Sequence, residues 1–366
     1  MKKEKSLIRE EILSIKPYIP GKPIEEVKRE LGLKEVIKLA SNETSIGPSP
    51  LAVEAIKKEA DNVNLYPDGS SRILREKLAQ KLKLDKEMII IANGGDNIIK
   101  LTGMAFINKD DEVIMGEITF PVYESVVKIM GGKIIPVKLK DYTYDLESII
   151  QRVNKRTKLI VVCNPNNPTG TIVTKEAVDK FMRNVPEDVI VVFDEAYCDY
   201  VEDDNYPDSL SYVREGKNVI VLRTFSKIAG LAGIRVGYAI AKQELIGYLR
   251  RVVDIFSVNR LAQVAALASL DDEEHKRKVL RLNKEGKGYL YKELKKLGLF
   301  YVPTETNFIF IDLKKDTKVI FEELLKKGII IRPGVTWGCP DFIRVTIGTP
   351  YENKKFIQAL KEVISI

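Results

Sequence analysis

The stretch NVIVLRTFSKIAGLAGIRVGYAI, residues 218–240, contains most of the information about how this chain folds. It joins two apolar runs, at 219–222 and 236–240, through a loop of small residues and glycines that carries Lys227. Short apolar runs without polar alternation are typical of strands that are buried on both faces of a sheet. A lysine in a glycine-lined, hydroxyl-bearing loop that continues to Arg235 suits an amine that forms a Schiff base beside a phosphate.

Strand and helix patterns alternate along the chain on the N-terminal side of this stretch. Further apolar runs of strand length occur at 88–92, 113–115, 134–137, 159–163 and 189–193. Helical patterns occur between several of them, at 98–107, 122–129 and 175–183. This alternation predicts an α/β domain with a mainly parallel sheet that is flanked by helices.

The pattern changes after about residue 243. Helical stretches are expected at 244–254, 261–270 and 273–296, and a second α/β unit follows with strands at 307–311, 329–331 and 342–347. We therefore expect three parts, which are an N-terminal arm with part of a small domain (1–45), a large domain (46–260) and a small C-terminal domain (261–366).

Composition limits the classes of function. The 366 residues are 45% hydrophobic and 30% charged, which is an ordinary globular balance. The net charge of +7 is spread over helices in which Lys and Glu alternate, so no nucleic-acid surface is expected. The apolar runs are too short to span a bilayer, no secretory signal is expected, and the cysteines form no CxxC pair. A cytoplasmic protein without membrane partners is expected.

One histidine, His275, constrains the mechanism. It lies in the segment DDEEHKRK, which predicts an exposed helix. A Ser-His-Asp triad, a Cys–His pair and a histidine-based zinc site are therefore improbable, and no metal is expected. The chemistry must use lysine, tyrosine, carboxylates or a cofactor.

Polar residues follow the predicted strands at their carboxyl ends, where ligands bind in open α/β sheets. Asp194 and Tyr197 follow the run 189–193, and Asn164 follows the run 159–163. A carboxylate at the end of a buried strand costs several kcal/mol unless it is paired, and a pyridinium nitrogen is a suitable partner. The alternatives are a salt bridge for Asp194 and a rigid turn for Asn164.

Three further strand ends fit the same picture. Gly95 and Asp96 open the helix after 88–92 and can bind a phosphate, although a simple helix cap is the alternative. Phe120 follows 113–115 and either stacks on a ring or belongs to the core. Thr224 and Ser226 add hydroxyls beside Lys227. Together these residues match the needs of pyridoxal phosphate.

The chain resembles the fold-type I pyridoxal-phosphate transferases of the class I/II aminotransferase superfamily. The segments that carry the resemblance include LASNETSIGPSP (39–50), YPDGSS (66–71), CNPNNPTG (163–170), DEAY (194–197) and TFSKIAGLAGIRVGY (224–238). Within the superfamily, the sequences of LASNETSIGPSP, YPDGSS and GLAGIR are most similar to those of the histidinol-phosphate aminotransferases. This resemblance implies transamination between L-histidinol phosphate and 2-oxoglutarate in histidine biosynthesis.

The resemblance also implies a role for individual residues. Lys227 would form the Schiff base and move the proton, Asp194 would pair with the pyridinium, and Tyr197 would contact the ring oxygen. The expected cofactor ligands are Gly95, Asp96, Phe120, Asn164, Asp194, Tyr197, Thr224, Ser226, Lys227 and Arg235, with Tyr66 reaching the site of the neighbouring subunit in a homodimer. The expected substrate ligands are Tyr18, Tyr66, Asn164, Arg332 and Arg344.

The sequence departs from the family pattern at two places. Gly95 and Asn97 stand where the family usually has serine and glutamate, which puts side-chain contacts to the phosphate there in doubt. Ala229 replaces an aromatic residue and is expected to widen the substrate channel. An aromatic amino-acid aminotransferase, a phosphothreonine decarboxylase and a non-catalytic ligand-sensing domain remain alternatives.

Overall fold

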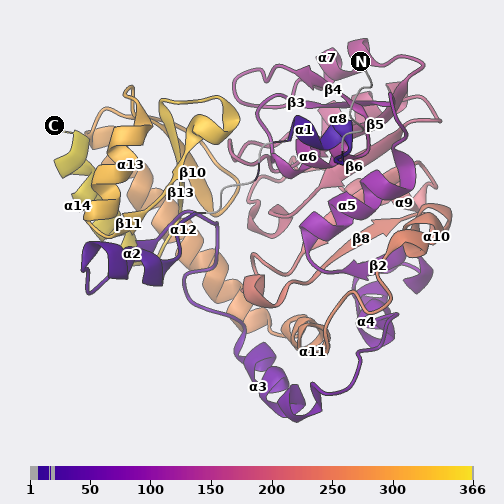
Figure 1. The fold of residues 1–366 in the computed structure, drawn as a ribbon, viewed down its shortest axis with the longest axis horizontal. Coiled ribbons are helices and arrows are strands. Elements are labelled where there is room, and N and C mark those ends of the chain that lie inside the picture. The colour runs from indigo at the N-terminus through magenta and orange to yellow at the C-terminus, as the bar shows by residue number, and fades with distance from the viewer. Residues whose placement is uncertain (1–6, 16, 18–20, 365–366) are drawn as a thin grey trace.

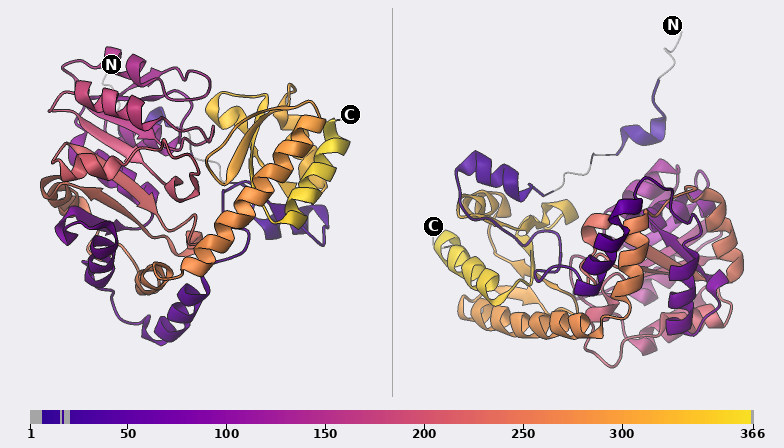
Figure 2. Two further views of the ribbon diagram at one scale, coloured as in Figure 1. Left: turned by 180° about the vertical axis from the view of Figure 1, so that it is seen from behind. Right: turned by 90° about the horizontal axis from the view of Figure 1, so that it is seen from below.

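The computed structural model describes residues 7–15, 17 and 21–364. A larger and a smaller α/β unit lie side by side, and the long helix α12 (Glu273–Lys296) runs from the edge of the larger unit into the smaller one (Figure 1). The view from behind shows the same arrangement, with α12 packed beside the C-terminal helix α14 (Pro350–Ile364) (Figure 2).

The larger unit is built on a seven-stranded sheet. Its strands, in spatial order, are β2 (Ile89–Ala92), β8 (Gly237–Ala241), β7 (Val219–Thr224), β6 (Ile190–Asp194), β5 (Thr157–Cys163), β3 (Glu112–Gly116) and β4 (Lys133–Val137). Strand β8 is antiparallel to both of its neighbours, and the other adjacent pairs are parallel. The predicted α/β class with a mainly parallel sheet is confirmed, and every predicted strand of this sheet is present.

Strand order follows from the connections. Between β7 and β8 the chain forms only the short turn η4 (Ala232–Ile234), and a connection without a crossover helix joins antiparallel neighbours. The central strands are buried along most of their length because helices cover both faces of the sheet (Figure 1). Strand β4 is partly exposed at the edge of the sheet, where Pro136 is tolerated.

Helices α3 to α11 belong to the larger unit. They are α3 (Pro50–Glu59), α4 (Arg72–Leu82), α5 (Gly95–Phe106), α6 (Val122–Ile129), α7 (Leu146–Arg152), α8 (Lys175–Asn184), α9 (Ser209–Arg214), α10 (Gln243–Val252) and α11 (Arg260–Ser269). Helices α4, α7 and α9 were not expected from the sequence. Helices α7 and α9 are only seven and six residues long, and so few residues show little helical periodicity. No helix among the described residues combines the length and apolar character needed to cross a bilayer.

The smaller unit combines early and late segments of the chain. Strand β1 (Ile37–Lys38) pairs in parallel with β11 (Ile329–Ile330), and α2 (Ile24–Leu31) contributes Val27 to the same small core. The remaining strands form an antiparallel sheet in the order β12 (Arg332–Pro333), β13 (Phe342–Thr346), β10 (Phe308–Asp312) and β9 (Phe300–Val302), packed against α12, α13 (Thr317–Lys326) and α14.

Two large apolar cores correspond to the two units. The buried alanines of α11, such as Ala262 and Ala266, belong to the core of the larger unit. The core of the smaller unit includes Leu290 and Leu294 of α12. We therefore propose that the boundary between the domains lies near residue 270, at the turn between α11 and α12.

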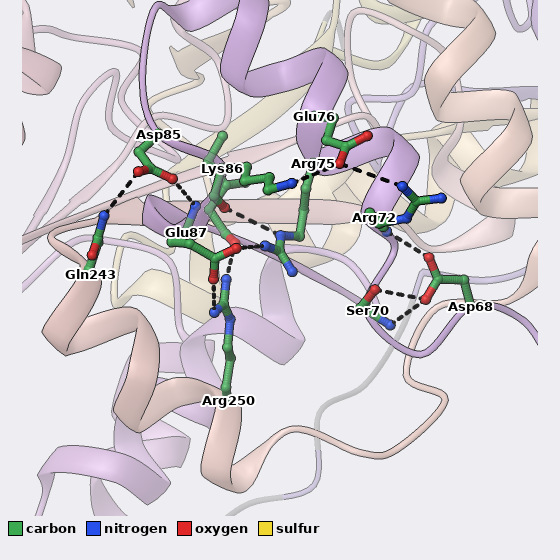
Figure 3. Close-up of polar contacts among 11 residues, drawn as sticks. Asp68, Ser70, Arg72, Arg75, Glu76, Asp85, Lys86, Glu87, Gln243 and Arg250 are labelled. Carbon is green, nitrogen blue, oxygen red and sulfur yellow. Dashed lines mark hydrogen bonds and ion pairs between the residues drawn. The ribbon is translucent and has the colours of Figure 1, made fainter.

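A polar cluster anchors the outer corner of the larger unit (Figure 3). Glu87 accepts hydrogen bonds from Arg75 of α4, at 2.7 Å, and from Arg250 of α10. Asp68 accepts the backbone N–H of Arg72 at 2.8 Å and that of Ser70 at 2.9 Å, so it ties the turn 66–71 to the start of α4. Tyr66 is therefore presented by a well-supported turn.

Candidate active site

Most of the predicted site residues lie around one cavity of about 200 Å³. The predicted residues that line it are Gly95, Asp96, Phe120, Asp194, Tyr197, Thr224, Ser226, Lys227, Arg235, Arg332 and Arg344. The larger unit supplies most of them from the carboxyl ends of its strands, which meet at one edge because the strands are parallel. The smaller unit supplies the two arginines 332 and 344.

Two predicted residues, Tyr66 and Asn164, do not line this cavity. Tyr18 lies outside the described residues. Tyr66 is 78% exposed and stacks on Phe256, with 4.5 Å between the ring centroids. Asn164 is buried beside the cavity, and its Oδ1 accepts the backbone N–H of Val173 at 3.0 Å. Its Nδ2 has no hydrogen-bond partner among the described residues.

Asp194, at the end of β6, is the buried acid of the site. One carboxylate oxygen accepts the backbone N–H of Ala196 at 3.1 Å, and the other accepts the hydroxyl of Tyr123 at 3.2 Å. Within the described part of the chain it forms no salt bridge, so the expectation of a simple salt bridge is not met. Burial raises the pKa of Asp194 to about 6. The carboxylate therefore has room for a cationic or N–H donor.

Replacing Tyr123 with phenylalanine is expected to raise the pKa of Asp194 further, because the hydroxyl stabilises the carboxylate. The native state then holds this proton up to a higher pH, and the range over which stability falls as the pH rises extends above about 6. Denaturant unfolding of the cofactor-free protein at a series of pH values measures this shift. Tyr144→Phe is the matched control, because its buried hydroxyl donates to Thr119 instead. Identical profiles of stability against pH for both variants would show that the hydroxyl of Tyr123 does not stabilise the Asp194 carboxylate.

Lys227 lies in the loop that follows β7. Its Nζ donates to the carbonyl of Ser41 at 3.2 Å and lies 5.5 Å from the ring centroid of Tyr197. Burial lowers the pKa of Lys227 to about 8, and the positive charge of Arg344 contributes to the shift. A lysine with such a pKa is largely protonated at neutral pH, yet it releases its proton far more readily than an exposed lysine.

An anion-binding surface lies beside Lys227. Arg235 donates to the hydroxyl of Ser226 at 3.4 Å, and its Nη2 lies 3.6 Å from Asp96. Gly94 precedes α5 with a φ of 85°, and a Cβ atom on it would lie 2.6 Å from the guanidinium of Arg235. The free N–H groups of the first helical turn and the guanidinium thus converge on one place.

The departure at 95–97 has a structural account. Gly95 brings only backbone to the cavity wall, so any contact with an anion there is made by its N–H group. Asn97 accepts from the backbone N–H of Asn93 and from the hydroxyl of Ser257, both at 3.2 Å. It therefore stabilises the turn before α5.

Arg344 is a buried arginine, 6% exposed, in the middle of β13. It donates to the Oδ1 of Asn167 and to the carbonyl of Ala40, both at 2.6 Å. Its guanidinium also lies over the rings of Phe308 and Trp337. These contacts orient a strong cation toward the cavity.

Three polar residues of the site were not expected from the sequence. Tyr123 supports Asp194, Asn167 supports Arg344, and the Nδ2 of Asn42 donates to the hydroxyl of Tyr197 at 2.8 Å. Asn167 could have been found as a neighbour of Asn164 in the same turn. Nothing in the local sequence around Tyr123 or Asn42 indicates these contacts.

Two expectations outside the cavity are wrong. Ala229 is 8% exposed and lines a second cavity of about 190 Å³ behind the lysine loop, so it does not widen the substrate channel. His275 is buried, 7% exposed, beside the same second cavity. His275 is buried because the first turn of α12 packs against the larger unit, where Lys276 pairs with Asp199. The charged local sequence does not reveal this contact.

Comparison with known proteins agrees with this geometry. Residues 34–360 match the family model described as aminotransferase class I and II. The histidinol-phosphate aminotransferase of Moorella thermoacetica is 54% identical, with 98% of this chain and 93% of that protein covered. The enzyme of the same name from Caldicellulosiruptor saccharolyticus is 50% identical, with 98% and 100% covered.

A solved structure is similar over the same length. The histidinol-phosphate aminotransferase from Sinorhizobium meliloti, in complex with pyridoxal-5'-phosphate, superposes with a TM-score of 0.91 at 29% identity. The alignment covers 99% of this chain and 98% of that one. Because the family model spans most of the sequence and the relatives align over nearly all of it, the chain belongs to the class I and II aminotransferases.

Proposed function

We propose that this protein transfers the amino group of L-histidinol phosphate to 2-oxoglutarate, with pyridoxal phosphate held in the cavity of Lys227. The observation that carries the proposal is a buried carboxylate, Asp194, without a salt-bridge partner among the described residues, in the same cavity as a lysine whose pKa is lowered to about 8. When bound, pyridoxal phosphate supplies an aldehyde for the amino group and a ring that accepts electrons.

The polar groups of the cavity fit this cofactor. Asp194 would pair with the ring nitrogen, whose positive charge compensates for the burial of the carboxylate. The Nδ2 of Asn164, which lacks a partner among the described residues, and the hydroxyl of Tyr197 would bind the ring oxygen. Phe120 would lie against the ring face. The pairing of Asp194 with the ring nitrogen would remove the cost of a buried unpaired charge.

The anion-binding surface would hold the cofactor phosphate. Arg235, Ser226 and Thr224 supply a guanidinium and two hydroxyls, and α5 supplies backbone N–H groups. Asp96, which faces Arg235 at 3.6 Å, would orient that arginine rather than touch the phosphate, because two anions repel each other.

Two arginines support the choice of substrates. Arg344 and Arg332 line the cavity from the smaller unit. A guanidinium binds phosphate and carboxylate with the same bidentate geometry, so these residues suit the phosphate of histidinol phosphate and a carboxylate of 2-oxoglutarate. The names of the relatives support histidinol phosphate as the donor.

An assay of the purified holoenzyme separates this proposal from its rivals. The protein is incubated with 2-oxoglutarate and with histidinol phosphate, phenylalanine or phosphothreonine as the amino donor. We expect glutamate to form fastest from histidinol phosphate. Faster turnover of phenylalanine would indicate an aromatic aminotransferase, and release of carbon dioxide from phosphothreonine would indicate a decarboxylase. Binding without turnover would indicate a sensor.

We further propose a homodimer in which Tyr66 reaches the cavity of the partner subunit. An exposed aromatic pair, Tyr66 and Phe256, is costly to leave in water, and the neighbouring Leu65 and Ile255 are 54% and 80% exposed. A second copy would cover this surface. We also propose that the enzyme is cytoplasmic, because its free thiols would remain reduced there.

Mixing two inactive variants tests the role of Tyr66. If Tyr66→Ala and Lys227→Ala subunits exchange, a mixed dimer holds one intact site, and about a quarter of wild-type activity is expected to return. Tyr351→Ala, which removes another exposed tyrosine, is the control and should remain active by itself. Mixed dimers without recovered activity would show that Tyr66 does not act across the interface.

A further inference from the structure

The segment 40–42 contacts three functional side chains of the cavity. The carbonyl of Ala40 accepts from Arg344 at 2.6 Å, the carbonyl of Ser41 accepts from Lys227 at 3.2 Å, and the side-chain amide of Asn42 donates to Tyr197 at 2.8 Å. Only the last of these contacts depends on a side chain of the segment. Among residues 40–42, Asn42 is therefore the one whose replacement would remove a contact with the site.

The orientation of the Asn42 amide is determined by Thr346 of the smaller unit. The hydroxyl of Thr346 accepts the backbone N–H of Asn42 at 2.9 Å and donates to its Oδ1 at 3.2 Å. Because Oδ1 is engaged in this way, Nδ2 is the group that faces the hydroxyl of Tyr197. Asn42 is 1% exposed, and Asn307 donates to its carbonyl at 3.0 Å.

The backbone of Asn42 adds a second constraint. Its φ is 55°, in the left-handed region that asparagine adopts more readily than most residues. The chain thus turns at this residue while its side chain reaches across from the smaller unit to Tyr197. Asparagine meets both requirements, because it tolerates this backbone and carries a donor of the required length.

The contact determines how the hydroxyl of Tyr197 is used. A phenol oxygen that accepts from Asn42 keeps its own proton for another acceptor, and Tyr197 lines the cavity. A donor that itself accepts a hydrogen bond is a stronger donor. The hydrogen bond from Asn42 lowers the pKa of Tyr197, which burial raises to about 12.

We propose that Asn42 is a positioning residue of the reaction, which directs the hydroxyl proton of Tyr197 to the ring oxygen of the cofactor as long as Thr346 holds its amide. The inference rests on the proposed function, since it requires pyridoxal phosphate in the cavity. A donated hydrogen bond favours the ionised form of that oxygen. Loss of Asn42 therefore makes the bound cofactor easier to protonate.

The test is a pH titration of the visible absorption band of the holoenzyme. Asn42→Gly removes the amide without straining a left-handed backbone. We expect its titration midpoint to rise by roughly 0.5 to 1 pH unit, the equivalent of one hydrogen bond. We expect kcat to fall by roughly three- to tenfold with little change in KM, because the contact is not with the substrate. The cofactor dissociation constant gives a readout that is independent of turnover.

Matched variants separate positioning from a structural role. Thr346→Val should shift the midpoint in the same direction, and Thr346→Ser, which keeps the hydroxyl, should not. Asn353→Ala removes another buried asparagine of the smaller unit, whose amide bonds the backbone of Gly348, and should leave the midpoint unchanged. In a Tyr197→Phe background, Asn42→Gly should have no further effect.

Each outcome has one meaning. A wild-type protein that binds no pyridoxal phosphate would overturn the proposed function itself. A wild-type band that Asn42→Gly leaves unmoved would overturn the inference alone. A shift of the same size in the Tyr197→Phe background would also overturn it, because Asn42 would then act without Tyr197.

Discussion

Lys227→Ala is expected to abolish covalent attachment of pyridoxal phosphate and to lower the transamination rate by roughly 10⁴-fold. In the proposed reaction, the amine of Lys227 would be the nucleophile for the aldehyde and would then move the proton of the substrate. A base works best when its pKa is near the working pH, and burial lowers the pKa of Lys227 to about 8. Borohydride reduction followed by peptide mass spectrometry should label Lys227 in the wild type and no peptide in the variant. Full activity of the variant would contradict the assignment of Lys227 as the lysine that forms the Schiff base.

The same variant has a second expected effect, on stability. A lysine whose pKa is lowered in the native state favours unfolding below that pKa, so the stability of the cofactor-free wild type rises as the pH increases from about 8 to 10.5. Lys227→Ala should therefore stabilise the cofactor-free protein at pH 7, by at most ~3 kcal/mol before packing losses. The gain should disappear above pH ~10.5. A variant that is less stable by the same amount at every pH would show that Lys227 is not perturbed.

Asp194→Asn is expected to keep the cofactor attached to Lys227 and to lower kcat by about a hundredfold or more. In the proposed reaction, the carboxylate would stabilise positive charge on the ring nitrogen, and an amide has no charge to do so. Single-turnover kinetics with histidinol phosphate measure the loss. The control is Asp271→Asn, a surface carboxylate bonded to Lys77, which should leave the rate unchanged. An unchanged rate in Asp194→Asn would make Asp194 purely structural.

At this position too, the substitution is expected to raise the stability of the cofactor-free protein while it lowers activity. Because burial raises the pKa of Asp194 to about 6, the native state binds a proton that the unfolded state releases near pH 4. The stability of the cofactor-free wild type therefore falls as the pH rises through this interval, by roughly 3 kcal/mol. Asp194→Asn should be more stable than the wild type at pH 7 and equal to it below pH ~4. Cofactor binding should reverse this order, since it pairs the charge.

The strand ends explain why much of the site could be predicted. The strands were visible as apolar runs, and residues that follow neighbouring parallel strands meet at one edge of a sheet. Asp194 ends β6 and Lys227 follows β7, and these two strands are adjacent in the sheet. Their proximity was therefore predictable without any knowledge of side-chain packing. The second α/β unit was predictable as well, because its strands and helices show the expected periodicity.

The supporting residues could not be predicted in this way. Tyr123 and Asp194 are 71 positions apart, and Asn42 and Tyr197 are 155 apart. These contacts join elements whose relative placement depends on packing rather than on strand order. Ala229 shows the same limit, because its loop could face either of two cavities, and the packing of the lysine loop decided which.

The sequence by itself determined the α/β class, most of the strands, and the acid and lysine at their ends, because periodicity and turn residues are local properties of the chain. Arg332 and Arg344 followed only from the family resemblance. Only the tertiary structure decided which amide holds Tyr197, which hydroxyl supports Asp194, and how far burial moves the pKa values of Asp194 and Lys227. Those properties depend on distance and desolvation, which arise only when segments far apart in the chain pack together.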